Sequence, residues 1–200
     1  MGLSEAQSRQ NQRHAWIAAG LVAAVSATLQ LLGLNEALSW DRGALAGGQP
    51  WRFLSGHFVH LGWSHLLLNL AGLALIAWIV GRAWDRLGWL LVSLVSIAVI
   101  GVGFWTLNPR LEWYVGLSGL LHGLLAAGLV VGIARRETES IVLAVLVAGK
   151  LAWEQFAGPL PGSEGASGGA VIVDAHLYGA VGGILAAVAM WRRVQPAASI

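Results

Sequence analysis

The stretch YVGLSGLLHGLLAAGLVVGIA, residues 114–134, indicates what kind of fold this chain adopts. From Leu117 to Ala134 it is almost wholly apolar, yet Ser118 and His122 interrupt its beginning. A membrane-spanning helix needs about 20 mostly apolar residues, and polar side chains inside a span are costly and mark functional sites by default. The stretch therefore predicts a membrane helix with a polar site near one end. Ser118 is then either a nucleophile or a small residue that lets two helices touch.

The composition of the whole chain favours a membrane protein. Of 200 residues, 56% are hydrophobic and only 11% are charged, whereas soluble domains carry about 25% charged residues. Eleven tryptophans suit the aromatic belts at membrane interfaces. A net charge of +2, with no basic tract among aromatics, does not indicate nucleic-acid binding. The absence of cysteine excludes disulfides and cysteine-ligated metals.

Six segments have the length and polarity of spanning helices. They are Ala15–Leu34, Leu61–Val80, Leu87–Leu107, Leu117–Ala134, Ser140–Phe156 and Ala175–Trp191. The first is longer than the apolar region of a secretory signal peptide, so we expect it to be retained. The sequence thus predicts an all-α membrane protein built as a six-transmembrane-helix bundle.

The basic residues predict how the bundle is oriented, because cytoplasmic loops are enriched in Lys and Arg. One side has Arg9, Arg13, Arg82, Arg86, Arg135, Arg136, Arg192 and Arg193; the other has Arg42, Arg52, Arg110 and Lys150. We therefore expect both termini to be cytoplasmic. The chain then divides into a cytoplasmic segment 1–14, a six-span domain 15–193 and a cytoplasmic tail 194–200.

Three polar clusters open the second, fourth and sixth predicted spans. They consist of His60, His65 and Asn69, then Ser118 and His122, then Asp174 and His176. In the predicted topology these three spans all begin on the outer side. The clusters therefore lie at one depth in the outer part of the membrane.

Glycine spacing predicts which helices meet. Gly119 and Gly123, like Gly179 and Gly183, form G-x-x-x-G pairs, which let helix backbones approach closely. Packing of the fourth span against the sixth would bring His176 within reach of Ser118. An imidazole is the usual base that activates a serine, and a dyad needs no acid if packing alone orients the ring.

The same clusters provide donors for an oxyanion. The free amides at a helix N-terminus point to Ser118, and the helix dipole there favours negative charge. His65 and Asn69 lie four residues apart, on one helix face, and add side-chain donors.

Other interpretations of these residues stay open. Taken alone, a serine among small residues is more often a packing residue, and G-x-x-x-G says only that helices pack. His57, His60 and His65 would suit a metal-binding protein or a small transporter, but no acidic residue accompanies them as in HExxH. We expect neither a metal nor a cofactor.

These motifs resemble those of the rhomboid intramembrane serine protease family, over residues 15–193. The resemblance rests on Gly116-x-Ser118-Gly119 opening the fourth span, His65-x-x-x-Asn69 in the second, and His176 before Gly179 and Gly183 in the sixth. It implies Ser118 as nucleophile, His176 as general base, and His65, Asn69 and the Ser118 amide as oxyanion hole. Gly116, Gly119, His122 and Gly179 would line the site. Trp51, Arg52, His60 and Gly183 would be structural.

One position points to a subgroup. Rhomboids often carry tyrosine four residues after the nucleophile, where this chain has His122. That pattern resembles rhombosortases, which are bacterial inner-membrane proteases. The resemblance implies substrates with a C-terminal tail of Gly-Gly, a transmembrane segment and basic residues, cleaved at a site open to the periplasm. The fifth span and the loop before the sixth would resemble the substrate gate and cap. The alternative is a catalytically silent relative that binds membrane helices.

Overall fold

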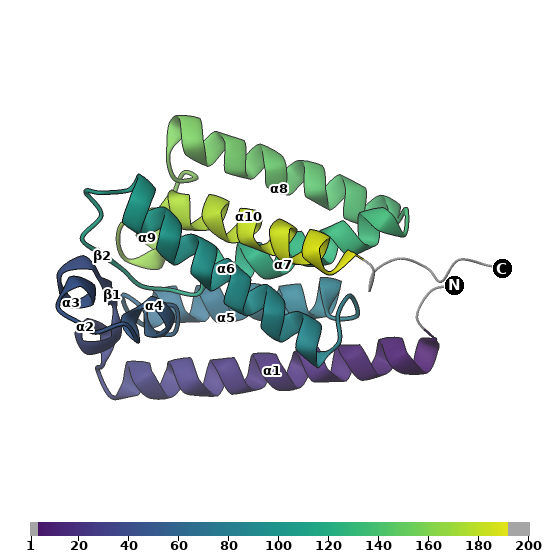
Figure 1. Cartoon of the computed structure of the whole chain (residues 1–200), viewed down its shortest axis with the longest axis horizontal. Coiled ribbons are helices and arrows are strands. Elements are labelled where there is room, and N and C mark those ends of the chain that lie inside the picture. The colour runs from purple at the N-terminus through teal and green to yellow at the C-terminus, as the bar shows by residue number, and fades with distance from the viewer. Residues whose placement is uncertain (1–3, 192–200) are drawn as a thin grey trace.

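The computed structural model describes residues 4–191, and these form a bundle of long helices with short elements gathered at one end (Figure 1). The long helices are α1 Glu5–Leu31, α5 Trp63–Val80, α6 Arg86–Leu107, α7 Ser118–Ala134, α8 Thr138–Ala157 and α10 Val173–Ala189. Each corresponds to one predicted span. By length and composition, α1, α5, α6 and α8 could cross a membrane, while α7 and α10 are apolar but shorter. The prediction of an all-α membrane architecture is therefore confirmed.

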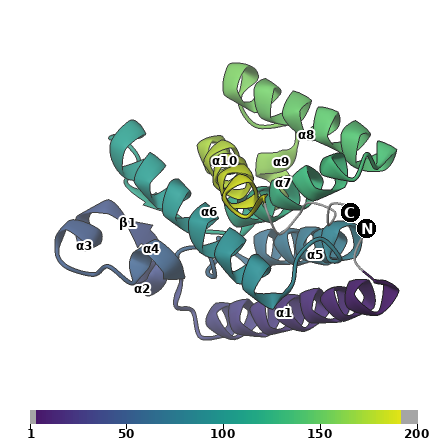
Figure 2. The same cartoon turned by 45° about the vertical axis from the view of Figure 1, so that its right-hand side comes forward.

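Helix α10 occupies the centre of the bundle, packed against α6 and α7 (Figure 2). The glycine pairs make this packing possible. A Cβ atom added to Gly179 or Gly183 would collide with the backbone carbonyl of Gly119 or Gly123, respectively. One added to Gly119 would lie 2.8 Å from the carbonyl oxygen of Ala175. The predicted close approach of these two helices is confirmed.

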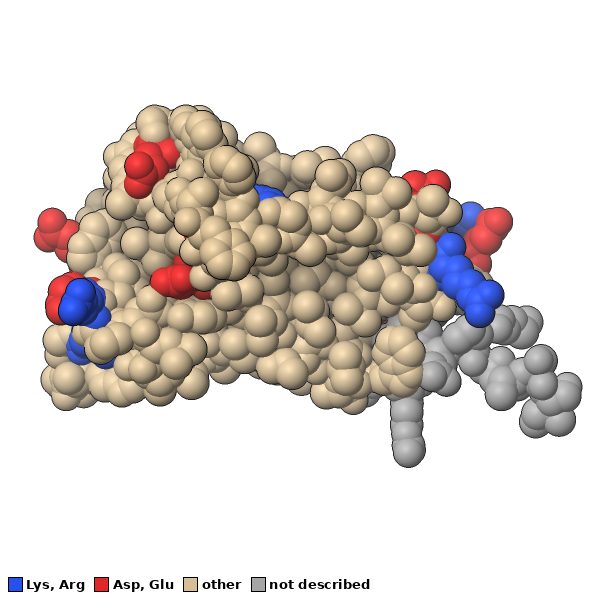
Figure 3. Space-filling model, turned by 90° about the horizontal axis from the view of Figure 1, so that it is seen from above, with Lys and Arg blue, Asp and Glu red and all other residues tan. Residues whose placement is uncertain are grey.

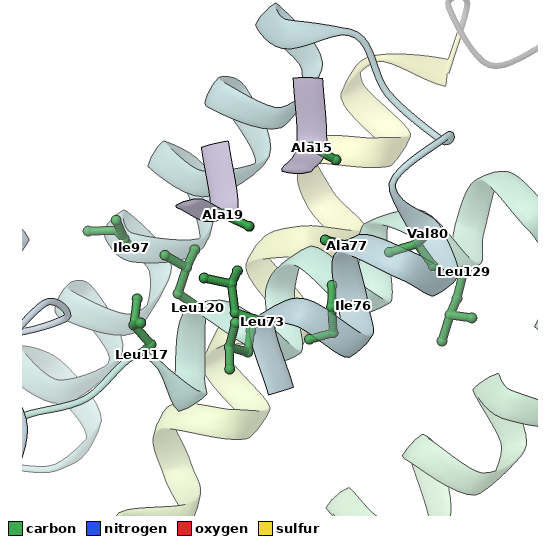
Figure 4. Close-up of a cluster of buried hydrophobic side chains, with 11 residues drawn as sticks. Ala15, Ala19, Leu73, Ile76, Ala77, Val80, Ile97, Leu117, Leu120 and Leu129 are labelled. Atoms are coloured by element: carbon green, nitrogen blue, oxygen red, sulfur yellow. The ribbon is translucent and has the colours of Figure 1, made fainter. Parts of the chain in front are cut away.

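A second contact region joins α1, α5 and α7 through apolar side chains (Figure 4). It contains Ala15, Ala19, Leu73, Ile76, Ala77, Val80, Leu120, Leu121 and Leu129, with Ile97 and Leu117 beside them. Two side-chain amides hold the N-terminal part of α1 beside this cluster: Gln12 donates to the carbonyl of Ala77 (2.7 Å) and Asn11 to that of Arg82 (3.3 Å). This part of the bundle thus has an apolar interior with polar hydrogen bonds near one end.

The segments between spans contain more structure than the predicted loops. The short elements are α2 Asn35–Leu38, β1 Trp40–Asp41, α3 Arg42–Ala46, α4 Arg52–Ser55, β2 Trp113–Tyr114 and α9 Ser163–Ser167. Strands β1 and β2 are antiparallel, with Trp40 opposite Tyr114. This ladder lies directly before α7 and positions the chain that enters the site.

Two arginines hold this end together. The Arg42 guanidinium donates to the carbonyls of Phe104, Asn108 and Leu111 at 2.7–2.9 Å, capping the end of α6. Arg52 donates to the carbonyls of Glu36 and Ser39, both at 2.9 Å. Its surroundings are those of a structural residue, whereas the neighbouring Trp51 is 54% exposed.

On the face shown in Figure 3, charged side chains lie mainly toward the two ends of the molecule, and few lie on the surface between them. Many large apolar side chains of the long helices are exposed. The turns after α5 and α7 lie at the end where α1 begins and α10 ends (Figure 1). This end has Arg9, Arg13, Arg82, Arg86, Arg135 and Arg136; Arg192, Arg193 and the predicted tail 194–200 fall outside the described residues. Lys150, which we counted with the opposite end, lies within α8 and forms an ion pair there. It is therefore not a loop charge.

Candidate active site

Ser118 and His176 meet where α7 and α10 begin. Ser118 is the first residue of α7, and His176 lies in the first turn of α10 with 5% of its surface exposed. His176 Nε2 is 3.1 Å from Ser118 Oγ. That is hydrogen-bonding distance between a hydroxyl and the group that could accept its proton.

A third residue, Glu154 of α8, completes the arrangement on the other side of the imidazole. Its Oε2 lies 2.9 Å from His176 Nδ1. Glu154 is 3% exposed and is the only buried residue of α8. Because an ionised carboxylate only accepts hydrogen bonds, His176 donates to it from Nδ1–H, and Nε2 is left free to accept the proton of Ser118. The dyad hypothesis assumed that packing alone orients His176. In the structure, a hydrogen bond to Glu154 also orients the ring.

A pattern in the sequence indicates a role for Glu154, which the motifs above did not include. Lys150 and Glu154 lie four residues apart inside the fifth predicted span, where a pair of opposite charges shares one helix face. Ionisable residues inside a span mark functional sites by default. What the spacing could not show is that this face turns toward His176.

Lys150 and His122 extend the network. Lys150 Nζ lies 2.7 Å from Glu154 Oε1, 3.0 Å from His122 Nε2 and 3.4 Å from His176 Nδ1. His122 Nδ1 lies 2.7 Å from the carbonyl oxygen of Ser118, one helical turn earlier. The rings of His122 and His176 are stacked, with centroids 4.2 Å apart and planes 20° apart. The structure thus has His122 beside the site, as predicted.

The donor atoms of His122, Glu154 and His176 lie within 4.8 Å of one another, which is a spacing that a metal ion could use. The Lys150 ammonium already contacts all three side chains. The metal alternative considered from the sequence involved other residues. Of these, His60 packs against His65 with ring centroids 5.1 Å apart, and His57 packs against Tyr114.

His65 and Asn69, the proposed oxyanion donors, lie on α5 beside the serine. The Leu61 amide donates to His65 Nδ1 at 3.4 Å, which leaves the proton of a neutral ring on Nε2. The ring packs against Gly116, whose φ of +119° and missing side chain both require glycine: a Cβ there would lie 2.9 Å from Nε2. Asn69 donates to the His65 carbonyl at 2.9 Å. Its side chain is thereby held in one orientation.

Tyr114 is a further site residue that the sequence did not single out. Its hydroxyl donates to the Gly116 carbonyl at 2.7 Å and accepts from the Gly119 amide at 3.4 Å, bracketing Ser118. Burial raises the pKa of Tyr114 to about 12. The phenol therefore stays protonated and keeps its role as a donor.

His57 and His60 lie between α4 and α5 and are buried, with 1% and 0% of their surfaces exposed. Burial lowers the pKa of His57 to about 4, and burial together with the nearby His65 lowers the pKa of His60 to about 3. Both rings are therefore neutral at physiological pH. This matches the structural role expected for His60.

Two cavities reach Ser118 from different directions. One of about 300 Å³ lies beside β2 and is lined by charged as well as apolar residues; the other, of about 450 Å³, lies between α5 and α8. The first includes Arg110, Glu112, Tyr114 and Ile172, and the second includes Leu68, Gly72, Val147, Lys150 and Leu160. His65, Ser118, Ser167 and Val171 line both. Both cavities thus combine apolar with charged or polar lining residues, and the serine can be reached through either.

Comparison with known proteins identifies the family. Residues 47–193 match the family model described as the Rhomboid domain, so the chain belongs to the rhomboid family. It is an integral membrane protein of a family whose members are generally intramembrane serine proteases.

Three relatives show how far the similarity extends. An uncharacterized protein of Mycobacterium tuberculosis is 28% identical over 195 residues, which cover 90% of this chain and 78% of the relative. A Bacillus subtilis protein named "Putative rhomboid protease YdcA" is 26% identical over 70% of this chain and 67% of its own length. "Rhomboid-like protease 5" of Toxoplasma gondii is 32% identical over 74% of this chain but only 17% of its own length.

Proposed function

We propose that this protein is an intramembrane serine endopeptidase in which Ser118 is the nucleophile, His176 the general base and Glu154 the residue that orients the base. The observation that carries the proposal is the continuous hydrogen-bonded chain from Ser118 Oγ through His176 to Glu154, with distances of 3.1 and 2.9 Å. This is the arrangement of nucleophile, base and orienting acid used in serine hydrolases.

In the proposed reaction, Ser118 Oγ attacks the carbonyl carbon of the scissile peptide while His176 Nε2 takes the hydroxyl proton. The oxyanion that forms accepts hydrogen bonds from the Ser118 amide and the His65 and Asn69 side chains, the largest single contribution in many acyl-transfer enzymes. The carbon–nitrogen bond then breaks, and His176 returns its proton to the leaving amine. A water molecule then gives its proton to His176 and attacks the acyl-serine. The bond to Ser118 Oγ breaks, His176 returns the proton to the serine, and the product leaves as a carboxylate. Glu154 stays ionised throughout.

We further propose a six-span topology in the bacterial inner membrane, with both termini cytoplasmic and the site open to the periplasm. The described Arg residues support this, since the end with the turns after α5 and α7 has six of them and the other end three: Arg42, Arg52 and Arg110. The cavity beside β2 would admit water, and the cavity between α5 and α8 would admit a substrate helix from the lipid. The domain limits 1–14, 15–193 and 194–200 follow from this topology.

The proposed substrates are exported proteins with a C-terminal tail of Gly-Gly, a transmembrane segment and basic residues, as in rhombosortases. His122 in place of the more usual tyrosine supports this narrower assignment. Residues Gly116, Gly119, His122 and Gly179 would line the site around the scissile bond.

Two experiments test the proposal. Purified protein should react with a fluorophosphonate at Ser118, and co-expression with a Gly-Gly-tailed protein should yield a new C-terminus, mapped by mass spectrometry. Ser118→Ala and His176→Ala should abolish both results. Ser93→Ala, whose hydroxyl donates to the Trp89 carbonyl within α6, should change neither. A chain that folds but never labels Ser118 would be the catalytically silent alternative. Labelling without cleavage would reject the substrate assignment alone.

A further inference from the structure

Lys150 belongs to the site network, but the proposed mechanism does not use it. Its side chain is 30% exposed to the cavity between α5 and α8, and its ammonium contacts Glu154, His122 and His176 together. The site thus has a cation of its own.

The charges around His176 balance only when Lys150 is included. The groups that face the imidazole are His65 of α5, Ser118 and His122 of α7, and Lys150 and Glu154 of α8. Of these, the Glu154 carboxylate is buried, and a buried charge without a partner is strongly unfavourable. Lys150 neutralises this charge at 2.7 Å, so a neutral His176 faces a pair with no net charge.

The position of the ammonium also affects proton uptake. A positive charge 3.4 Å from His176 Nδ1 opposes the addition of a proton to the Glu154–His176 pair, whichever partner receives it. A base that is already protonated cannot accept the Ser118 proton. Glu154 alone would orient His176 but would also favour its charged form, so the ammonium offsets that effect in the resting state.

The same ammonium orients His122. Because an ammonium only donates, His122 Nε2 must accept, and the proton of the neutral ring lies on Nδ1, which donates to the Ser118 carbonyl. The stacked ring therefore stays neutral. A neutral ring can lie against His176 when that ring becomes charged during the reaction, which a charged ring could not do without repulsion.

We propose that Lys150 is a positioning residue that keeps the Glu154–His176 pair unprotonated at rest and holds His122 neutral against His176. The inference rests on the proposed protease function. It assigns Lys150 to the control of the general base and not to the binding of substrate.

The test is the rate of fluorophosphonate labelling of purified full-length protein as a function of pH, which needs no substrate. In Lys150→Met, the acid limb of the profile should move to higher pH by roughly one unit, as expected for removal of a charge within about 4–6 Å. Labelling should recover above that limb. In Glu154→Gln the limb should move the opposite way, because the group that favours the charged imidazole is lost.

Two control variants keep the result interpretable. Leu146→Met, on the exposed side of α8, should leave the pH profile unchanged. Lys150→Arg keeps the positive charge, so its acid limb should coincide with that of wild type. The inference would be overturned if the acid limb of Lys150→Met coincided with that of wild type, or if its labelling rate fell by the same factor at every pH. If wild-type protein does not label while remaining folded, it is the proposed function that fails.

Discussion

At the scale of single residues, the site depends on which nitrogen of each imidazole carries a proton. Glu154 holds the proton of His176 on Nδ1, and Lys150 places that of His122 on Nδ1 as well. His65 accepts a hydrogen bond from the Leu61 amide at Nδ1, so its own proton lies on Nε2. Each assignment follows from a neighbour that can only donate or only accept.

His122 gives a prediction at this scale. His122→Ala removes the ring stacked on His176 and the acceptor of Lys150, so labelling of Ser118 should slow by at least about tenfold, the effect of losing about 1.4 kcal/mol. His122→Tyr keeps an aromatic ring and an oxygen, and should lose less. The comparison is made from fluorophosphonate labelling rates, with Ser118→Ala as the blank. Equal rates for Ala and wild type would mean that His122 only lines the cavity.

At the scale of elements, the crossing of α7 and α10 determines whether the site exists. The backbones of the two helices are in contact at Gly119 and Gly179. This contact brings the start of α7 close to the start of α10. Elsewhere on α10, Tyr178 donates to Asn108 at 2.6 Å, and Asn108 in turn donates to Asp174. The start of α10 is therefore tied both to α7 and to the end of α6.

Adding one methyl group at this crossing should disable the protein. Gly179→Ala places a Cβ against the Gly119 carbonyl, and overpacking of this kind costs about 1–3 kcal/mol. We expect a lower unfolding temperature and a severe loss of labelling, since α7 and α10 must separate. Gly149→Ala, on α8 with nothing near the added atom, is the matched control. If Gly179→Ala labels as wild type does, the crossing tolerates movement and does not set the geometry.

The segment between α4 and α5 should be sensitive to acid. The folded-state pKa values of His57 and His60 are lowered to about 4 and about 3, below the unfolded value near 6.5. The unfolded chain therefore binds more protons below pH 6.5, and stability falls as the pH drops from there toward 4.

Thermal unfolding measured between pH 7 and pH 4 checks this expectation. His57→Phe removes one titrating group while keeping a ring against Tyr114, so its unfolding temperature should fall less steeply with acid. Identical slopes for the variant and wild type would show that other groups account for the pH dependence.

At the scale of the whole molecule, the exposed apolar side chains of the long helices and the two charged ends define how the bundle can lie in a bilayer. Side chains such as Leu21, Val145, Leu146 and Phe156 are 64–93% exposed, as expected for helices that face lipid. The site lies where α7 and α10 begin, at the end of the bundle with the short elements (Figure 1).

Because the chain has no cysteine, single cysteines can report its orientation. Ala46→Cys, exposed at the end of α3, should react with a membrane-impermeant maleimide added to spheroplasts, since we propose that this end is periplasmic. Thr138→Cys, exposed at the start of α8, should react only after lysis. The reverse pattern would invert the proposed topology, and reaction of both without lysis would reject it.

The sequence by itself determined the helices, their order and the residues Ser118 and His176. Each of these depends on local properties: apolar runs of spanning length, glycine pairs four apart, and polar side chains where none are expected. Only the tertiary structure decided that Glu154 meets His176, that Lys150 joins the site instead of a loop, and that Tyr114 brackets the serine. The physical reason is that these contacts depend on the rotation of α8 about its axis and on the path of β2. Both are set by packing between segments distant in the chain, and the local pattern of either segment does not specify them.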